Sequence, residues 1–439
     1  MPLKLPRTAT APFCPSEVRG VIDIPQGLPF WRKALRSAGP GLLVAVGYMD
    51  PGNWATDIEA GSRYSYDLLF VVVSCGLAAM LLQWLAMRLG LVTGRDLGQM
   101  ARDRYGRATC LFLWLLAELA IIATDIAEVL GSALAFNLLL GVPLWLGVLL
   151  TGLDTMLVLG LKGQGFRQIE AIILGLVATI GICFAVQLAI AGPDVGGILH
   201  GMVPKPALLM DQHALYLAVG ILGATVMPHN LYLHSSVVQT RLTGSSDTAR
   251  RTAIRFATID IVVALLLATL VNGAILTLSA ATFHASGHSY VAEIEDAYRL
   301  LAPLTGATAA AALFAIALFA SGQSATFTGT IAGQVILEGF LDLRIPCWQR
   351  RVITRVLALV PALAGILWLG DHAVGRLLVL TQVVLSLQLP FALYPLIRFT
   401  GDRAIMGAFV TPRWAAAIAW ALFALIASAN LWLIAQWIG

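Results

Sequence analysis

Long apolar runs recur from residue 38 to residue 437 of this 439-residue sequence, and they constrain its fold more than any other feature. An α-helix crosses the bilayer core of about 30 Å with roughly 20 apolar residues. Only 12% of the residues are charged and the mean hydropathy is +0.83, which excludes a water-soluble fold. The sequence therefore predicts an all-α polytopic membrane protein with 11 transmembrane helices. The runs cover residues 38–65, 68–91, 109–139, 144–161, 169–191, 215–240, 257–281, 304–340, 352–369, 377–397 and 414–437.

The basic residues are distributed unevenly between the loops that join these runs. With eleven spans, 24 of the 28 Lys and Arg residues fall on one side of the membrane. Because cytoplasmic loops are enriched in Lys and Arg, we expect a cytoplasmic N-terminus and an extracytoplasmic C-terminus in the cell inner membrane. Prolines and basic residues precede the first run, so residues 1–37 are predicted to be a cytoplasmic tail rather than a signal peptide. The basic residues expected on the outer side are Arg63, Lys205, Arg299 and Arg376.

Two of the apolar runs are interrupted near their centres by proline and polar residues. Proline removes a backbone donor and clashes with the preceding turn, whereas glycine loosens a helix. We therefore expect helices 1 and 6 to be broken, at Pro51 and Gly52 and at Pro228. A charged aspartate at the centre of a span costs roughly 2.5 to 3.5 kcal/mol on insertion scales, which favours a functional role for Asp50 over a plain proline kink. The interruptions read Asp50-Pro51-Gly52-Asn53 and Met227-Pro228-His229-Asn230.

The two interruptions occupy equivalent places in an internal repeat. Pro51 and Pro228 are 177 residues apart, and the asparagines two residues after each proline keep the same offset. A unit of five spans is odd-numbered, so its second copy inserts with inverted topology. Paired breaks in two inverted halves indicate the binding site of a transporter. We predict a transmembrane domain over residues 38–439, with repeat one at 38–192, repeat two at 214–398 and an extra helix at 414–437.

The residue types at the breaks indicate which ion could bind there. Asp50 offers an anionic oxygen, Asn53 a neutral oxygen, and the backbone freed near Ala224 a carbonyl oxygen. Met227 adds a soft thioether, although ordinary packing is the alternative role for a buried methionine. Oxygen ligands alone suit Mg²⁺ or Ca²⁺, whereas a thioether favours softer ions such as Mn²⁺ or Fe²⁺.

With these motifs the chain resembles the Nramp (natural resistance-associated macrophage protein) family of divalent metal transporters, and Met227 favours its Mn and Fe branch. The resemblance implies an amino acid/sodium symporter-like fold of two inverted five-helix repeats, and proton-coupled import of Mn²⁺, Fe²⁺ and similar ions. It implies metal ligation by the side chains of Asp50, Asn53 and Met227, by the carbonyl of Ala224, and by Gln382 as a further ligand. Besides the two interruptions, it rests on Ala123 to Glu128, Gly322 to Ser324, Thr328 to Thr330 and Gln382 to Pro390, and it spans Ala38 to Arg398.

Carboxylates on the third span suggest a path for protons. Asp125 and Glu128 follow Glu118 by 7 and 10 residues, and about 100° per residue places all three on one helix face. Several carboxylates are costly in lipid, so we expect this face to line water or to contact a cation such as Arg355. A structural ion-pair network is the alternative interpretation.

Two histidines of the sixth span are further candidates for proton transfer. His229 adjoins the proposed metal site, and an unperturbed histidine titrates near a pH of about 6.5, which suits reversible protonation. Metal ligation is the alternative role for His229, and a structural role is the alternative for His234. Asp50 could hold either the metal or a proton, and this competition would couple the two flows.

We therefore expect a secondary active importer of divalent transition-metal ions that works as a monomer, uses no cofactor and is not an enzyme. No phosphate-binding loop of the ATPase type is present, and the five cysteines form no CxxC pair that would indicate a zinc site. The alternatives are an amino acid/sodium symporter of the same fold and a metal-sensing membrane receptor, which would normally carry a soluble signalling domain. An excess of Arg over Lys, 24 to 4, suggests a bacterial source.

Overall fold

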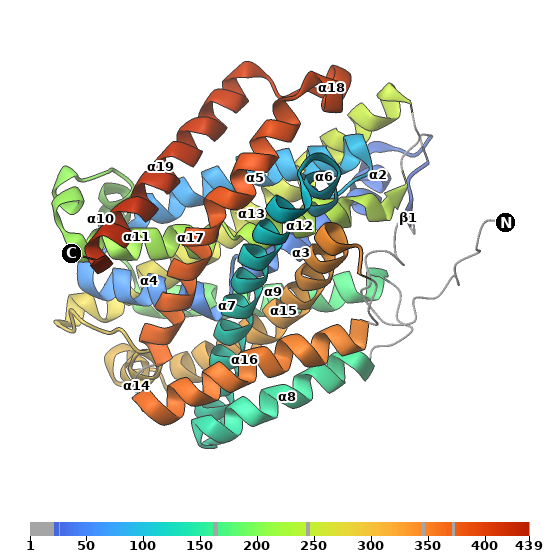
Figure 1. Ribbon diagram of the computed structural model, residues 1–439. Coiled ribbons are helices and arrows are strands. Elements are labelled where there is room, and N and C mark those ends of the chain that lie inside the picture. Colours follow the sequence, from blue (N-terminus) through green and yellow to red (C-terminus); the bar gives the residue numbers. More distant parts are fainter. Residues whose placement is uncertain are drawn as a thin grey trace.

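The computed structural model describes residues 22–25, 27–160, 166–242, 246–343, 347–370 and 374–438. Residues 1–21 of the predicted tail lie outside these ranges. The described chain is a bundle of long helices (Figure 1), and the all-α prediction is confirmed except for one short parallel strand pair. The strands are β1 (Ile22–Asp23) and β2 (Arg241–Leu242), which join the segment before the first span to the segment after the sixth.

The long helices reproduce the predicted order of spans. In the first half they are α3 (Pro40–Gly47) and α4 (Pro51–Tyr64), which together form the first span, then α5 (Leu69–Thr93), α7 (Arg107–Leu140), α8 (Leu144–Gly160) and α9 (Phe166–Ala191). In the second half they are α11 (Gln212–Thr225) and α12 (Pro228–Val237), which form the sixth span, then α13 (Asp247–Thr282), α15 (Thr308–Leu341), α16 (Cys347–Leu369) and α17 (Val374–Gly401). The last is α19 (Arg413–Ile438).

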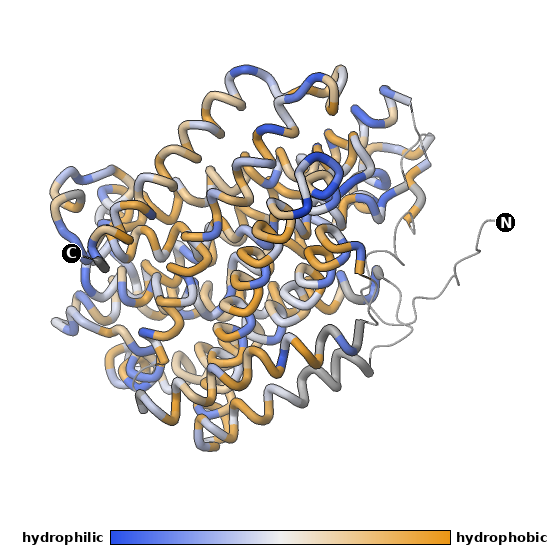
Figure 2. Tube along the Cα trace, in the orientation of Figure 1, coloured by the Kyte–Doolittle hydropathy of each residue, from blue (hydrophilic) through white to orange (hydrophobic). Residues whose placement is uncertain are grey.

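Length and composition agree with eleven crossings. Among the described residues, 8 segments are long and apolar enough to cross a membrane, the sixth span being one of them. The divided first span α3/α4 and the helices α8 and α16 supply the others. Figure 2 shows the apolar residues concentrated along the helices and the hydrophilic ones gathered toward their ends. Large apolar side chains also cover the outside, such as Leu270 and Leu431, which are 63% and 67% exposed, as expected of a surface in contact with lipid.

Short helices in the connections were not predicted from the sequence, because they lack a long apolar run. The predicted eighth span also starts too early, since α14 and α15 are separated by Gly306, whose φ of 67° ends α14. Similarly, α13 starts well before residue 257, because Ser246 caps it by accepting a hydrogen bond from the Ala249 N–H at 3.2 Å. The short helices are α2 (Phe30–Ser37), α6 (Leu97–Arg104), α10 (Val195–Gly201), α14 (Ile294–Thr305) and α18 (Arg403–Met406).

The connections that contain these short helices lie at two opposite ends of the bundle. In Figure 1, β1, α2, α6 and α18 lie toward the upper right, and α10 and α14 lie toward the left. The first group belongs to the loops rich in Arg and Lys, and the second to the loops that are poor in them. An arrangement with alternating loops at opposite ends is what eleven consecutive crossings require.

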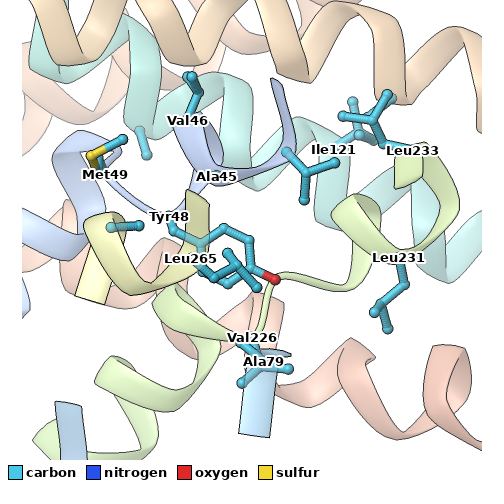
Figure 3. Packing of buried hydrophobic residues seen from close by; sticks show 14 of the residues in the cluster. Ala45, Val46, Tyr48, Met49, Ala79, Ile121, Val226, Leu231, Leu233 and Leu265 are labelled. Carbon is cyan, nitrogen blue, oxygen red and sulfur yellow. The ribbon is translucent and has the colours of Figure 1, made fainter. Parts of the chain in front are cut away.

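The apolar core surrounds the first break. Tyr48, between α3 and α4, belongs to a large cluster of buried residues that includes Ala79, Val226 and Leu265 (Figure 3). Its hydroxyl accepts a hydrogen bond from the Gln83 amide at 2.9 Å, so the polar end of the ring is satisfied within the core. The broken part of the first span is therefore held by packing from α5, α11/α12 and α13.

Candidate metal-binding site

The first break places a carboxylate at a helix start inside the core. Residue 51 is proline, so the Gly47 carbonyl has no N–H four residues ahead and instead accepts from the Asp50 N–H at 3.3 Å. Asp50 is the N-cap of α4, and its Oδ1 accepts a hydrogen bond from the Asn53 N–H at 2.9 Å. Asp50 is completely buried, and its Oδ2 has no hydrogen-bond partner in the described part of the chain.

The second break frees a carbonyl in the same way. Helix α11 ends at Thr225 and α12 begins at Pro228, which leaves Val226 and Met227 outside helical geometry. In a continuous helix the Ala224 carbonyl would accept from the N–H of residue 228, which proline lacks. Both Ala224 and Met227 are completely buried.

The carboxamide of Asn53 connects the two breaks. Its Nδ2 donates to Asp50 Oδ1 at 2.7 Å and to the Ala224 carbonyl at 3.1 Å. Three of the five residues predicted as metal ligands therefore meet at one point, although 171 residues of chain separate Asn53 from Ala224. The two breaks, predicted to be equivalent from their 177-residue offset, thus lie side by side in the fold.

The other two predicted ligands border the same breaks. Gln382 of α17 lies against Gly52, where an added Cβ would be 1.6 Å from its Nε2. Its Oε1 has no hydrogen-bond partner among the described residues. The thioether sulfur of Met227 accepts a hydrogen bond from Asn230 Nδ2 at 3.6 Å. Gly52 is thus needed for the close approach of Gln382.

Asn272 of α13 is a member of this cluster that the sequence analysis missed. Its Nδ2 donates to Asn53 Oδ1 at 3.1 Å and to the Tyr48 carbonyl at 2.9 Å. Its own Oδ1 is buried and lacks a hydrogen-bond partner in the described ranges. The available signal was a single carboxamide in the middle of a long apolar span, a type of residue that commonly bonds between membrane helices.

The predicted histidines lie beside this cluster and point to two different neighbours. His229 Nδ1 is 3.3 Å from the Thr124 hydroxyl of α7, one residue before Asp125. His234 Nδ1 is 3.0 Å from Gln83 Oε1, and Gln83 in turn donates to Tyr48. His229 therefore lies between the second break and the carboxylates of α7, whereas His234 belongs to a hydrogen-bonded chain that ends at the first break.

Two of the three carboxylates predicted to share a face come together. A Cβ added at Gly329 of α15 would lie 2.7 Å from Glu128 Oε1 and 3.3 Å from Asp125 Oδ1, so both carboxylates face that glycine. Arg355 of α16 interacts electrostatically with Glu128 and donates to the Thr151 carbonyl at 3.0 Å from Nη2 and 3.2 Å from Nε. Glu118 lies two turns closer to the start of α7, where it is half-buried.

The arrangement is chemically suited to a cation. Buried oxygens without partners are rare in folded proteins, and each one suggests an unseen ion or water. Among the described residues, Asp50 Oδ2, Gln382 Oε1 and Asn272 Oδ1 are such atoms, all in or next to the two breaks. The described part of the chain contains no group of three or more His, Cys, Asp or Glu side chains that could hold a metal. A cation held here would therefore rely on one carboxylate together with amide, carbonyl and thioether donors.

Known proteins with similar sequences cover nearly the whole chain. Residues 41–436 match the family described as natural resistance-associated macrophage protein-like. The "Divalent metal cation transporter MntH" of Ralstonia nicotianae is 63% identical over 432 residues, which is 98% of either chain. The "Divalent metal cation transporter MntH 1" of Pseudomonas aeruginosa is 62% identical over 439 residues, which is 100% of both.

Solved structures give the same result for the fold. The crystal structure of the Eremococcus coleocola manganese transporter, in complex with an aromatic bis-isothiourea substituted compound, matches with a TM-score of 0.89 and 38% identity. The match covers 96% of this chain and 90% of that one. Mhp1, a nucleobase-cation-symport-1 family transporter, matches with a TM-score of 0.59 at 16% identity, which shows a shared fold.

The predicted architecture of 11 transmembrane helices, with two inverted five-helix repeats and broken first and sixth helices, is thereby confirmed. The resemblance read from the two interrupted motifs is confirmed by a match that extends over the whole bundle. This multi-pass membrane protein belongs to the Nramp (natural resistance-associated macrophage protein-like) family.

Proposed function

We propose that this protein is a secondary active transporter that imports divalent transition-metal ions, Mn²⁺ and Fe²⁺ among them, together with protons. The observation that carries the proposal is the meeting of both broken helices at the Asn53 carboxamide, which contacts Asp50 and the Ala224 carbonyl. Broken helices of inverted repeats commonly hold the substrate of a secondary transporter. The names of the relatives, divalent metal cation transporters and a manganese transporter, support a metal as the substrate.

The proposed ligands are Asp50, Asn53, the Ala224 carbonyl, Met227 and Gln382. Asp50 is their only anionic group, so the remaining donors contribute neutral dipoles that stabilise the ion without a second charge. The thioether of Met227 favours transition metals over Mg²⁺ and Ca²⁺, which prefer oxygen. This donor set also opposes the alternative of an amino acid/sodium symporter, which has no use for a thioether.

Metal binding requires a rotation of the Asn53 side chain. Its NH₂ group now faces Asp50 and Ala224, and only its oxygen could bind a cation. A half-turn about the Cβ–Cγ bond of Asn53 directs Oδ1 into the site and Nδ2 toward Asn272. If the Asn272 carboxamide turns as well, its Oδ1, which is free of partners among the described residues, accepts the hydrogen bond. The two carboxamides thus keep a hydrogen bond to each other when the metal arrives, while Asn272 gives up the one that it donates to the Tyr48 carbonyl.

The proposed proton path starts beside the metal. Asp50 holds either the metal or a proton, and His229 bridges toward α7 through Thr124. Asp125 and Glu128, facing Gly329, continue the path with Arg355 as their cationic neighbour. Glu118, closer to the start of α7, and His234, hydrogen-bonded to Gln83, are the remaining members.

The proposed membrane orientation places the loops rich in Arg and Lys in the cytoplasm. The N-terminus is then cytoplasmic and the C-terminus extracytoplasmic in the cell inner membrane, with residues 1–37 as a tail and 38–439 as the transport domain. Repeat one at 38–192, repeat two at 214–398 and the extra helix at 414–437 complete the proposed organisation. We propose that one chain suffices for transport, because both broken helices of the site belong to it.

The decisive experiment is Mn²⁺ uptake into proteoliposomes that contain a pH-sensitive dye, with and without an inward proton gradient. We expect metal uptake with simultaneous internal acidification, both increased by the gradient. Binding of Mn²⁺ without uptake would favour a metal-sensing receptor instead. Uptake that depends on Na⁺ but not on protons would contradict the proposed coupling.

The first test of the site is Met227→Ala. Without the thioether the remaining donors are oxygens, so we expect Ca²⁺ to compete with Mn²⁺ at about tenfold lower concentration than in the wild type. Initial rates of Mn²⁺ uptake at increasing Ca²⁺ concentrations give this ratio. Met87→Ala is the matched control, since Met87 of α5 is also completely buried but is not one of the proposed ligands. Equal Ca²⁺ sensitivity of the two variants would rule out Met227 as a ligand.

The proton path is tested by Glu128→Gln, which keeps the side-chain shape but cannot carry a proton. We expect Mn²⁺ binding to persist within about threefold, while proton uptake falls by about a hundredfold, the low end of the range for removal of an acid–base group. The pH dye and radioactive Mn²⁺, measured in the same vesicles, give the two fluxes. Glu338→Gln, on α15 outside this cluster, should retain both. If the interior of vesicles that contain the Glu128→Gln variant acidifies normally, protons do not pass through Glu128.

A further inference from the structure

A cavity lies at the end of the bundle that we assign to the cytoplasm. Its volume is about 550 Å³, it is open to the surroundings, and it is lined by the end of α6, the last turns of α17, the short helix α18 and the first part of α19. The residues that define its chemistry are Arg104, Tyr105, Tyr394, Arg398, Asp402 and Trp420. None of them belongs to the proposed metal site or to the proposed proton path.

The charged groups of this cavity favour an anion. Neither Arg104 nor Arg398 forms an ion pair with a carboxylate among the described residues, although other arginines of this surface do, such as Arg95 with Asp103. Asp402 is the one acidic residue in the lining, and its Oδ1 already accepts a hydrogen bond from the Ala404 N–H at 2.8 Å. The ionisable lining therefore has a net positive charge and two guanidinium groups available for a ligand.

Aromatic rings form the side of the cavity that borders the lipid. The rings of Tyr394 and Trp420 meet edge to face, with centroids 5.9 Å apart, and Tyr105 packs against Phe399 with centroids 5.5 Å apart. Tyr394 is 44% exposed and Trp420 is 37% exposed. Tyrosine and tryptophan are enriched where a membrane protein passes from hydrocarbon to headgroups. The cavity thus combines aromatic side chains typical of the membrane interface with two guanidinium groups.

From this combination we infer a binding site for a phosphate group, supplied by the headgroup of an anionic phospholipid of the cytoplasmic leaflet. Arginine binds phosphate oxygens in a bidentate manner, and basic pockets between transmembrane helices commonly hold anionic headgroups. Arg104 and Arg398 bind the phosphate, while the acyl chains extend along the lipid-facing surface beside Trp420. A lipid held here links α6 to α17 and α19, which lie far later in the sequence.

The test uses the full-length protein in mild detergent, titrated with phosphatidylglycerol, with phosphatidylcholine or with inorganic phosphate, and bound species are counted by native mass spectrometry. We expect the wild type to bind phosphatidylglycerol at least about tenfold more tightly than phosphatidylcholine. A tenfold difference in affinity is about what one hydrogen bond to a charged group contributes. In the double variant Arg104→Gln/Arg398→Gln the preference should fall to within about twofold. The double variant Arg95→Gln/Arg250→Gln removes the same charge from exposed positions outside the cavity and should keep the wild-type preference.

Three results would overturn the inference or change the source of the phosphate. No preference for phosphatidylglycerol in the wild type would overturn it. An equal loss in both double variants would overturn it as well, because general surface charge would then explain the preference. If millimolar inorganic phosphate displaces the lipid, and binds only when Arg104 and Arg398 are present, the phosphate site stands but its ligand is a free anion. Thermal melting of each variant without lipid identifies any that are misfolded.

Discussion

Replacing Asp50 with asparagine should reduce Mn²⁺ uptake by at least about a hundredfold, which corresponds to nearly 3 kcal/mol of lost stabilisation of the ion. Asp50 is the only anionic group among the five proposed ligands. An asparagine has almost the same shape and can still accept the Asn53 N–H bond that starts α4. The neutral side chain leaves a divalent ion with dipoles alone in a site that excludes bulk water. Initial uptake rates in proteoliposomes measure the effect.

The control for this variant is Asp103→Asn. Asp103 forms an exposed ion pair with Arg95 at 3.6 Å, so its replacement should leave uptake within about twofold of the wild type. Both variants should melt within a few degrees of the wild type, because neither creates a cavity or a clash. Substantial uptake by a correctly folded Asp50→Asn variant would show that the metal is not held by this carboxylate.

Replacing Gly223 with alanine should destabilise the protein and impair transport by about tenfold or more. A Cβ at position 223 would lie 2.1 Å from the Gln382 carbonyl oxygen and 2.9 Å from the Ser386 Cβ, so α11 would have to move away from α17. Overpacking of this kind costs roughly 1–3 kcal/mol, and here the obstacle is a helix backbone that cannot yield as a side chain can. The shift would also withdraw Gln382 from the breaks. A thermal melt in detergent and an Mn²⁺ uptake assay report the two effects.

Gly273→Ala is the matched control, since its Cβ would make ordinary contact with Leu69 Cδ1 at 3.6 Å. Alanine favours a helix by roughly 1 kcal/mol over glycine, so this variant should melt at or slightly above the wild-type temperature. If Gly223→Ala is as stable and as active as Gly273→Ala, then the close approach of α11 and α17 is unimportant for the site.

Much of the candidate site could be predicted because the breaks follow from local rules. A proline after Asp50 or Met227 leaves a carbonyl four residues earlier without its donor, whatever the surrounding fold. The offset of 177 residues, which Pro51 and Pro228 share with the asparagines two residues after them, then indicated that the two breaks are related. What local rules could not supply is the neighbour of each freed group. Asn272 was missed for this reason, because its importance depends on contacts with Asn53 and Tyr48, which are more than 200 residues away.

The sequence by itself determined the class of the fold, the number of crossings and the positions of the breaks. Lipid cannot hydrogen-bond a backbone, so the crossings must be helical, and most of them are long apolar runs that a hydropathy profile reveals. Only the tertiary structure decided which polar groups meet. Lipid-exposed and buried helix faces are equally apolar, so periodicity does not reveal how membrane helices pack, and small residues and interhelical hydrogen bonds select their partners. The contact of Asn53 with Ala224, the fit of Gly223 against Gln382 and the cavity of Arg104 and Arg398 therefore became visible only in the folded chain.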